Sequence, residues 1–229
     1  EIYTLSLHDA LPIYELSLFS RPRTAGALTH ALRYAVELGD PQAALSLSDA
    51  VDLLDETLGS DHPDALAARG GLAAAYQAAD RLEQAIFLFE RTLTDSEHIL
   101  GSDHPHTLTS RGNLATAYEI ADRLEQAIDL FERTLTDSEH ILGPNHPHTL
   151  TSRGNLANTY WSAGRRDEAI DLYEQNLADR ERFLGPDHSC TLTSRDDLAY
   201  AYQSAGRLDK AVPLFEQILA KFVDRKSVV

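Results

Sequence analysis

The chain has 229 residues, of which 43% are hydrophobic and 24% charged, and its formal net charge is −16. It has no run of eighteen apolar residues, so we expect no membrane-spanning helix. The negative charge excludes nucleic acids and anionic membranes as favoured partners, because the field of the protein repels both. We expect a neutral or basic protein or peptide as the partner instead.

Both ends of the sequence look foreign to the rest. Residues 1–14, which we expect to be disordered or an artefact, and residues 224–229 resemble translated adapter read-through, so we exclude both from functional interpretation. The sequence contains no methionine, so we expect a piece of a longer product. Its single cysteine, Cys190, cannot form an internal disulfide, which fits a cytoplasmic location, and we interpret it as a packing residue.

The main feature of the chain is the motif Leu-Gly-x-x-His, which recurs at a constant interval of 42 residues, starting at Leu58, Leu100, Leu142 and Leu184. Two successive blocks, 60–101 and 102–143, differ at only nine positions. Such spacing indicates that one supersecondary unit is used several times. The predicted units are a degenerate one at 18–59, followed by 60–101, 102–143, 144–185 and 186–223.

The degenerate unit is predicted to contain a helix over 24–38, a turn, and a second helix over 41–58. In the clearest unit, Pro105 suits the first helical position, with Asp103 or His104 as the cap. Apolar residues at helical spacing then predict a first helix that ends before Asp122. Asp122 belongs to a series of residues that enter left-handed backbone easily, which predicts a tight turn. The series is Asp80, Asp122, Gly164 and Gly206.

A second amphipathic helix is predicted from about Leu124 to Leu142, with Gly143 as its C-terminal stop. Each unit is therefore a helical hairpin. A lone hairpin buries too few large apolar side chains to offset its conformational entropy, so it needs a neighbour. We predict an all-α fold, an α-solenoid of about five antiparallel helical hairpins with nearest-neighbour contacts.

The residues Leu114-Ala115-x-x-Tyr118, Asp122-Arg123-x-x-x-Ala127 and Phe131 resemble the tetratricopeptide repeat pattern, lengthened from its usual 34 residues. The longer form is similar to kinesin light chain repeats and to bacterial, actinobacterial-like arrays. This resemblance implies a protein-binding scaffold in which the first helices line a concave groove. In bacteria such arrays often follow a signalling ATPase, and the abundant alanine and arginine suit a high-GC bacterial source.

By that resemblance, the residues of the first helices that lie outside the packing stripe face the groove. They are Thr109, Asn113, Thr116, Glu119, Thr151, Asn155, Asn158, Trp161, Ser162, Thr193, Asp197, Tyr200 and Gln203. Asn113 and Asn155 match an asparagine of kinesin light chain repeats, and a ladder of amides can bind an extended peptide backbone. Gly71 and Asp197 interrupt this ladder. The alternative is that both asparagines are ordinary exposed residues.

Two groove features have open interpretations. Trp161 is the only tryptophan and fits an interface anchor, but burial between neighbouring repeats is the alternative. Asp196 and Asp197 could receive a lysine or arginine of the ligand, or could be solvated surface charges.

One arginine occurs per repeat, and we expect these side chains to act as structural spacers paired with carboxylates on the adjacent hairpin. They are Arg69, Arg111, Arg153 and Arg195. Binding of acidic ligand groups is the alternative role. The histidine pairs, such as His104 with His106, lack the spacing and further ligands of a metal site, so we expect no metal.

We find no nucleotide-binding, esterase or metalloprotease motif, so we expect no enzyme and no cofactor. The leading hypothesis is a scaffold that binds an extended segment of a partner in the groove. The alternative is a structural or self-associating array of a larger bacterial, NTPase-linked signalling protein, with its end hairpins stacking on one another.

Overall fold

The computed structural model describes residues 22–226, with side chains from 25 to 220, and its regular elements in that range are helices. The predicted all-α helical repeat fold is confirmed. The chain divides into two compact units, Glu1–Ala121 and Asp122–Val229. The predicted leader at 1–14 lies outside the described residues.

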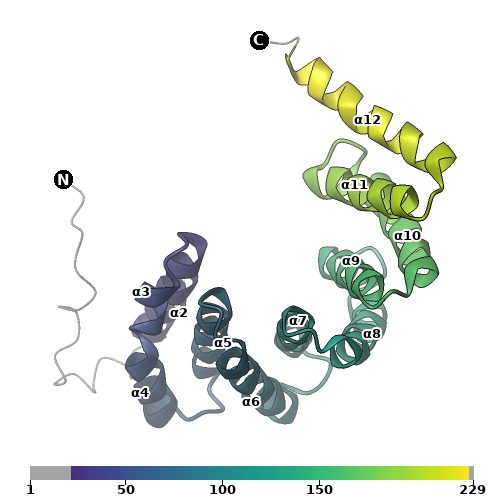
Figure 1. The fold of residues 1–229 in the computed structure, drawn as a ribbon. Coiled ribbons are helices and arrows are strands. Elements are labelled where there is room, and N and C mark those ends of the chain that lie inside the picture. Colours follow the sequence, from purple (N-terminus) through teal and green to yellow (C-terminus); the bar gives the residue numbers. More distant parts are fainter. Residues whose placement is uncertain (1–21, 227–229) are drawn as a thin grey trace. The chain divides into compact units, whose positions relative to one another are not determined.

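In the first unit α2, α3 and α4 pack on α5, α5 packs on α6, and α6 packs on α7 (Figure 1). Its described helices are α2 (Pro22–Glu37), α3 (Pro41–Leu45), α4 (Ser48–Leu58), α5 (Pro63–Ala78), α6 (Leu82–Leu100) and α7 (Pro105–Ile120). Leu32 of α2, Leu54 of α4 and Leu72 of α5 belong to one buried apolar cluster. The first hairpin therefore buries its apolar face against the second, as a repeat that cannot fold alone requires.

The second helix of the degenerate hairpin is not continuous, contrary to the prediction of one helix over 41–58. It is divided into α3 and α4 at Ser46 and Leu47. The Ser46 hydroxyl donates a hydrogen bond of 2.7 Å to the carbonyl of Ala43 and competes with helix continuation. Leu47 is buried, and its backbone N–H donates a hydrogen bond of 3.1 Å to the carbonyl of Ala44.

The second unit repeats the same stacking, with α9 packed on α8 and α10, and α11 packed on α10 and α12. Its helices are α8 (Leu124–Ile141), α9 (Pro147–Ser162), α10 (Arg166–Leu184), α11 (Ser189–Ser204) and α12 (Leu208–Lys226). Helix α12 continues three residues into the segment 224–229 that the sequence analysis set aside as a tail. The large core side chains include Phe131 and Ile170, which are buried between the stacked helices.

Helix ends and turns in both units follow from the repeated residues. His104 caps α7: its Nδ1 accepts the backbone N–H of His106 at 3.1 Å, which decides between the two candidate caps. Histidines 62, 146 and 188 make the equivalent bond at 3.2 Å. The left-handed turn is confirmed as well, since Asp122 has φ 58° and Gly206 has φ 72°.

Candidate functional site

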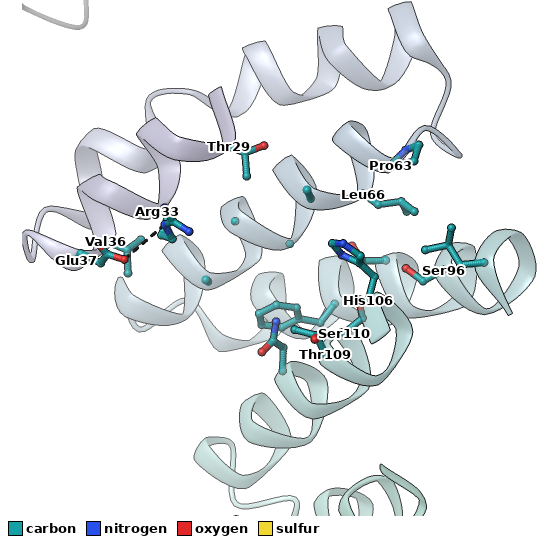
Figure 2. A pocket seen from close by; sticks show the side chains of 18 residues that line it. Thr29, Arg33, Val36, Glu37, Pro63, Leu66, Ser96, His106, Thr109 and Ser110 are labelled. Atoms are coloured by element: carbon teal, nitrogen blue, oxygen red, sulfur yellow. Dashed lines mark ion pairs between the residues drawn. The ribbon is translucent and has the colours of Figure 1, made fainter. Parts of the chain in front are cut away.

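A pocket of about 320 Å³ lies in the first unit, with walls from three first helices, α2, α5 and α7, and further lining from α6 (Figure 2). Helix α5 contributes Pro63 and Leu66 at its N-terminal end and then four small residues, Ala67, Gly70, Gly71 and Ala74. The next repeat has Thr109, Gly112, Asn113 and Thr116 at the positions of these four. At three of these four positions this repeat has a smaller residue than the next one, which leaves room for the pocket.

The rim of the pocket is polar and its floor is mixed. Arg33 and Glu37 of α2 lie on one side, 3.6 Å apart as an ion pair, and His106 and Thr109 of α7 lie on the other (Figure 2). Phe89 of α6 contributes an aromatic ring to the floor, next to Thr92 and Ser96 of the same helix. An apolar group can enter while polar groups remain at the mouth.

The predicted groove residues of the first unit are all on α7, and none is buried. Thr109 and Asn113 are exposed and line the pocket, while Thr116 and Glu119 are partly exposed. The Thr109 hydroxyl donates to the carbonyl of Pro105 at 3.0 Å. Because such hydroxyls bond to their own helix, this surface offers fewer free donors than the sequence suggested.

The predicted asparagines fall into two kinds. Among the residues that the structure describes, the side-chain amides of Asn113 and Asn155 have no hydrogen-bond partner. Asn158 instead accepts a hydrogen bond of 2.6 Å from the Tyr173 hydroxyl of α10. Asn113 and Asn155 can therefore bind a ligand backbone, whereas Asn158 also holds α9 to α10.

Trp161 of α9 is partly exposed, so it is not enclosed between repeats. The guanidinium carbon of Arg166 lies 5.1 Å from the centre of its ring, within the range of a cation–π contact. Thr151, on the same helix, is exposed, and its hydroxyl donates to the carbonyl of Pro147 at 2.9 Å. Part of the Trp161 ring is therefore accessible on α9, beside the Arg166 guanidinium.

Helix α11 carries the remaining predicted groove residues. Tyr200 and Gln203 are exposed, and the Tyr200 ring meets the Phe215 ring edge-on, with centroids 5.3 Å apart. Asp197 is half-buried. Burial raises the pKa of the Asp197 carboxyl, the negative charge of Asp196 adds to this, and Arg180 opposes it.

Arg180 and Asn176 on α10 are site residues that the sequence analysis missed. Arg180 links two first helices: its Nη2 donates to the carbonyl of Leu150 in α9 at 3.3 Å, and its Nη1 donates to the carbonyl of Cys190 in α11 at 2.9 Å. In the two preceding repeats these positions hold threonine and serine, at Thr92 and Ser96 and at Thr134 and Ser138. That departure from the repeat was the available signal.

The repeated arginines are buried and paired with carboxylates, which confirms the structural prediction made for them. Arg69 lies 2.8 Å from Asp55 on the preceding hairpin and 2.5 Å from Asp95 on its own. Arg153 and Arg195 bond in the same way to carboxylates of the preceding helix at 2.8 and 2.7 Å. Such side chains hold neighbouring hairpins together and are not exposed to an acidic ligand.

A second set of polar links joins the hairpins. The Tyr160 hydroxyl of α9 donates to Glu132 of α8 at 2.5 Å, and Tyr118 makes the equivalent bond to Glu90. Burial, together with the bond to Glu132, raises the pKa of Tyr160 to about 12. The phenol therefore remains a proton donor at neutral pH.

The histidines of the second unit have structural surroundings. His148 Nδ1 lies 3.3 Å from the Ser138 hydroxyl, and burial lowers the pKa of its imidazole, with His146 adding to the effect. No group of three or more His, Cys, Asp or Glu side chains in residues 22–226 has the arrangement of a metal site. Within the same range, no helix combines the length and apolar character needed to cross a membrane.

Models of the tetratricopeptide repeat match residues 65–106, 88–139, 113–181 and 164–222. The chain belongs to the tetratricopeptide repeat family. Tetratricopeptide repeats generally form protein–protein interaction scaffolds, so the coarse functional prediction is supported. A comparison with the curated proteins finds none that matches the chain.

Solved structures place these tetratricopeptide repeats in the kinesin-light-chain-like type, as predicted. One solved structure, described as nearly identical tetratricopeptide-like repeats of a kinesin light chain from Podosopora anserina, is 33% identical to this chain. The alignment covers 87% of this chain and 95% of that one, with a TM-score of 0.77. BtubC from P. vanneervenii is 18% identical, and the alignment covers 93% of this chain and 92% of that one, with a TM-score of 0.66. MamA is also 18% identical, covering 85% and 95%, with a TM-score of 0.58. The last two likenesses concern the fold alone.

Proposed function

We propose that the chain is a non-catalytic, cytoplasmic scaffold that binds an extended segment of a partner protein against its first helices. The binding surfaces are the pocket between α2, α5 and α7 in the first unit and the surface of α9 and α11 in the second. The pocket is the observation that carries this proposal, because three successive first helices form its walls and two predicted groove residues, Thr109 and Asn113, line it.

The chemistry of these surfaces suits a peptide. The amides of Asn113 and Asn155 each offer donors and an acceptor, which a peptide backbone can satisfy whatever its side chains. A volume of about 320 Å³ is about twice that of an engineered cavity that holds benzene, so the pocket can admit a large apolar side chain. The net charge of −16 favours a neutral or basic segment.

A catalytic role has no support in the described side chains. The repeated arginines are paired with carboxylates, and the histidines at the helix starts serve as caps. These groups therefore have structural partners, and a general acid or base would have to come from elsewhere.

Replacement of both Asn155 and Trp161 by alanine is the test of this proposal. A phage-displayed library of random dodecapeptides is selected on the wild-type chain, and the affinity of the enriched peptides is measured by fluorescence anisotropy. We expect the double variant to bind these peptides at least about 30-fold more weakly, because a tryptophan anchor alone can contribute 2 kcal/mol or more. Its helicity, measured by circular dichroism, should be unchanged.

The matched control is Gln175→Ala, which removes a similar amide from an exposed position of α10. This control should bind like the wild type. Undiminished binding by the Asn155/Trp161 variant would place the ligand elsewhere. Failure of the wild type to enrich any sequence over bare plastic would count against peptide binding altogether.

A second candidate function, self-association through the end hairpins, is favoured by the surface of α12. Val212 is 49% exposed, whereas Ile170, at the equivalent position of α10, is 1% exposed. We therefore expect wild-type mass in light scattering to rise with concentration and Val212→Glu to remain a monomer. A wild-type chain that is monomeric at every concentration would rule out this candidate.

A further inference from the structure

One carboxylate in the second unit lacks the partner that comparable carboxylates have. Glu139 and Asp179 are paired with Arg153, and Glu132 accepts a bond from Tyr160. Asp197 on α11 is half-buried, yet within the described part of the chain its carboxylate has neither an ion pair nor a hydrogen bond. A half-buried carboxylate without a donor is costly, so a binding partner that supplies one is favoured.

The neighbouring cation does not satisfy this carboxylate. Arg180 interacts with Asp197 only through its charge, and the residue beside Asp197 is a second carboxylate, Asp196. The Nη1 group of Arg180 donates to the carbonyl of Cys190 at 2.9 Å and to the hydroxyl of Ser194 at 2.8 Å. Both Nη groups of Arg180 therefore donate to other residues and its Nε has no hydrogen-bond partner, while Asp196 adds a second negative charge beside Asp197.

Asn176 of α10 has an unused acceptor. Its side chain is only 2% exposed, and its Oδ1 has no hydrogen-bond partner. Its Nδ2 lies 3.1 Å from the position that a Cβ on Gly154 of α9 would occupy, so the amide is packed against α9. The Nη2 of Arg180 lies 3.8 Å from the same position, so the Asn176 amide is close to the guanidinium that connects α9 and α11.

An aromatic ring lies beside the carboxylate. Tyr200 is three residues after Asp197, so the two side chains emerge on the same face of α11. Tyr200 is 56% exposed, and its contact with Phe215 is edge-on, which leaves ring surface available. A carboxylate next to an open aromatic face is the combination that attracts organic cations.

We propose that Asp197 receives a lysine or arginine side chain of the bound segment, with Tyr200 against its aliphatic stem and the acceptor of Asn176 beneath it. This inference rests on the proposed function and deepens it, because it names a basic peptide as the partner. Charge complementarity argues for this occupant: the cation replaces the donor that Asp197 lacks, in a chain whose net charge is −16.

The test uses random dodecapeptides selected on the wild-type chain and, in parallel, on Asp197→Asn. We expect the wild-type selection to be enriched in lysine or arginine at one position and the Asp197→Asn selection to lose that enrichment. Replacing that lysine or arginine by glutamine in a synthetic peptide should weaken binding to the wild type by about tenfold or more. It should have little effect on binding to Asp197→Asn.

Two further variants separate a direct contact from a general charge effect. Asp171→Asn removes one charge from an exposed position of α10 and should bind like the wild type. Asp197→Lys should prefer the peptide whose basic residue is replaced by glutamate. A general charge effect would not confine this change of preference to one position of the peptide. Tyr200→Leu should weaken the basic peptide severalfold and leave the glutamine peptide unaffected.

The outcomes distinguish this inference from the proposed function. The scaffold function is supported if the enriched peptides lose affinity for the Asn155/Trp161 variant. The cation site is nevertheless overturned if those peptides show no preference for a basic residue, or if they bind Asp197→Asn as tightly as the wild type. A wild-type chain that enriches no peptide would overturn both.

Discussion

Replacement of Arg69 by methionine is expected to destabilise the first unit by about 3–5 kcal/mol, because it removes the cation from a buried ion-pair cluster. Arg69 is 1% exposed and contacts Asp55 at 2.8 Å and Asp95 at 2.5 Å. Methionine retains much of the stem packing, so the loss reports mainly the charge. Urea unfolding followed by circular dichroism gives the free energy of unfolding.

Arg91→Met is the matched control, since Arg91 pairs with the same carboxylate of Asp55, at 3.4 Å, but is 46% exposed. An exposed ion pair contributes between 0 and about 1 kcal/mol, so this variant should remain close to the wild type. If both variants lost equal stability, burial would not be what makes Arg69 important. If neither lost stability, the repeated arginines would not join the hairpins.

The repeat period explains why so much of the fold could be predicted. A residue that occurs at the same place in each unit has the same structural task each time, so the apolar stripes and the left-handed turn at Asp122 could be assigned from their recurrence. The pairing of Arg153 with a carboxylate of the preceding hairpin follows from the same logic. Such features depend on local sequence and on nearest neighbours only.

The features that escaped prediction depend on a single repeat. The division of the second helix into α3 and α4 occurs at Ser46, whose hydroxyl bonds to the carbonyl of Ala43, in a unit without a regular period. The pocket arises where the small residues of α5 face α2 and α7, and Gly71 had been interpreted only as a gap in the asparagine ladder. Which side chains meet across three helices cannot be derived from one helix's pattern.

The differences between repeats also indicate where recognition is expected. Of the nine positions that differ between 60–101 and 102–143, eight lie in or at the first helix and one, Phe87, lies in the second. The residues that join hairpins, such as Arg69 and Phe89, are identical in the next unit. Packing therefore restricts one set of positions, while three of the varying positions of α5, Ala67, Gly71 and Ala74, line the pocket.

Replacement of Phe89 by alanine is expected to cost about 3–5 kcal/mol of stability, as the loss of a large buried aromatic side chain typically does. Phe89 is 2% exposed in α6 and lines the pocket, so the same change would remove part of the pocket floor. Phe87, two residues earlier in the same helix, is 64% exposed and is replaced by Asp129 in the next repeat. Phe87→Ala should therefore alter stability by less than about 0.5 kcal/mol.

The two phenylalanine variants test the stacking of the first unit, because they delete the same atoms from opposite sides of one helix. Thermal and urea unfolding of both should separate them clearly, with only Phe89→Ala unfolding at a markedly lower midpoint. Equal losses would mean that α6 does not bury the side that packs on α5 and α7. A stable Phe89→Ala variant would mean that this ring is not a core residue, and the pocket would then lack the floor on which peptide binding depends.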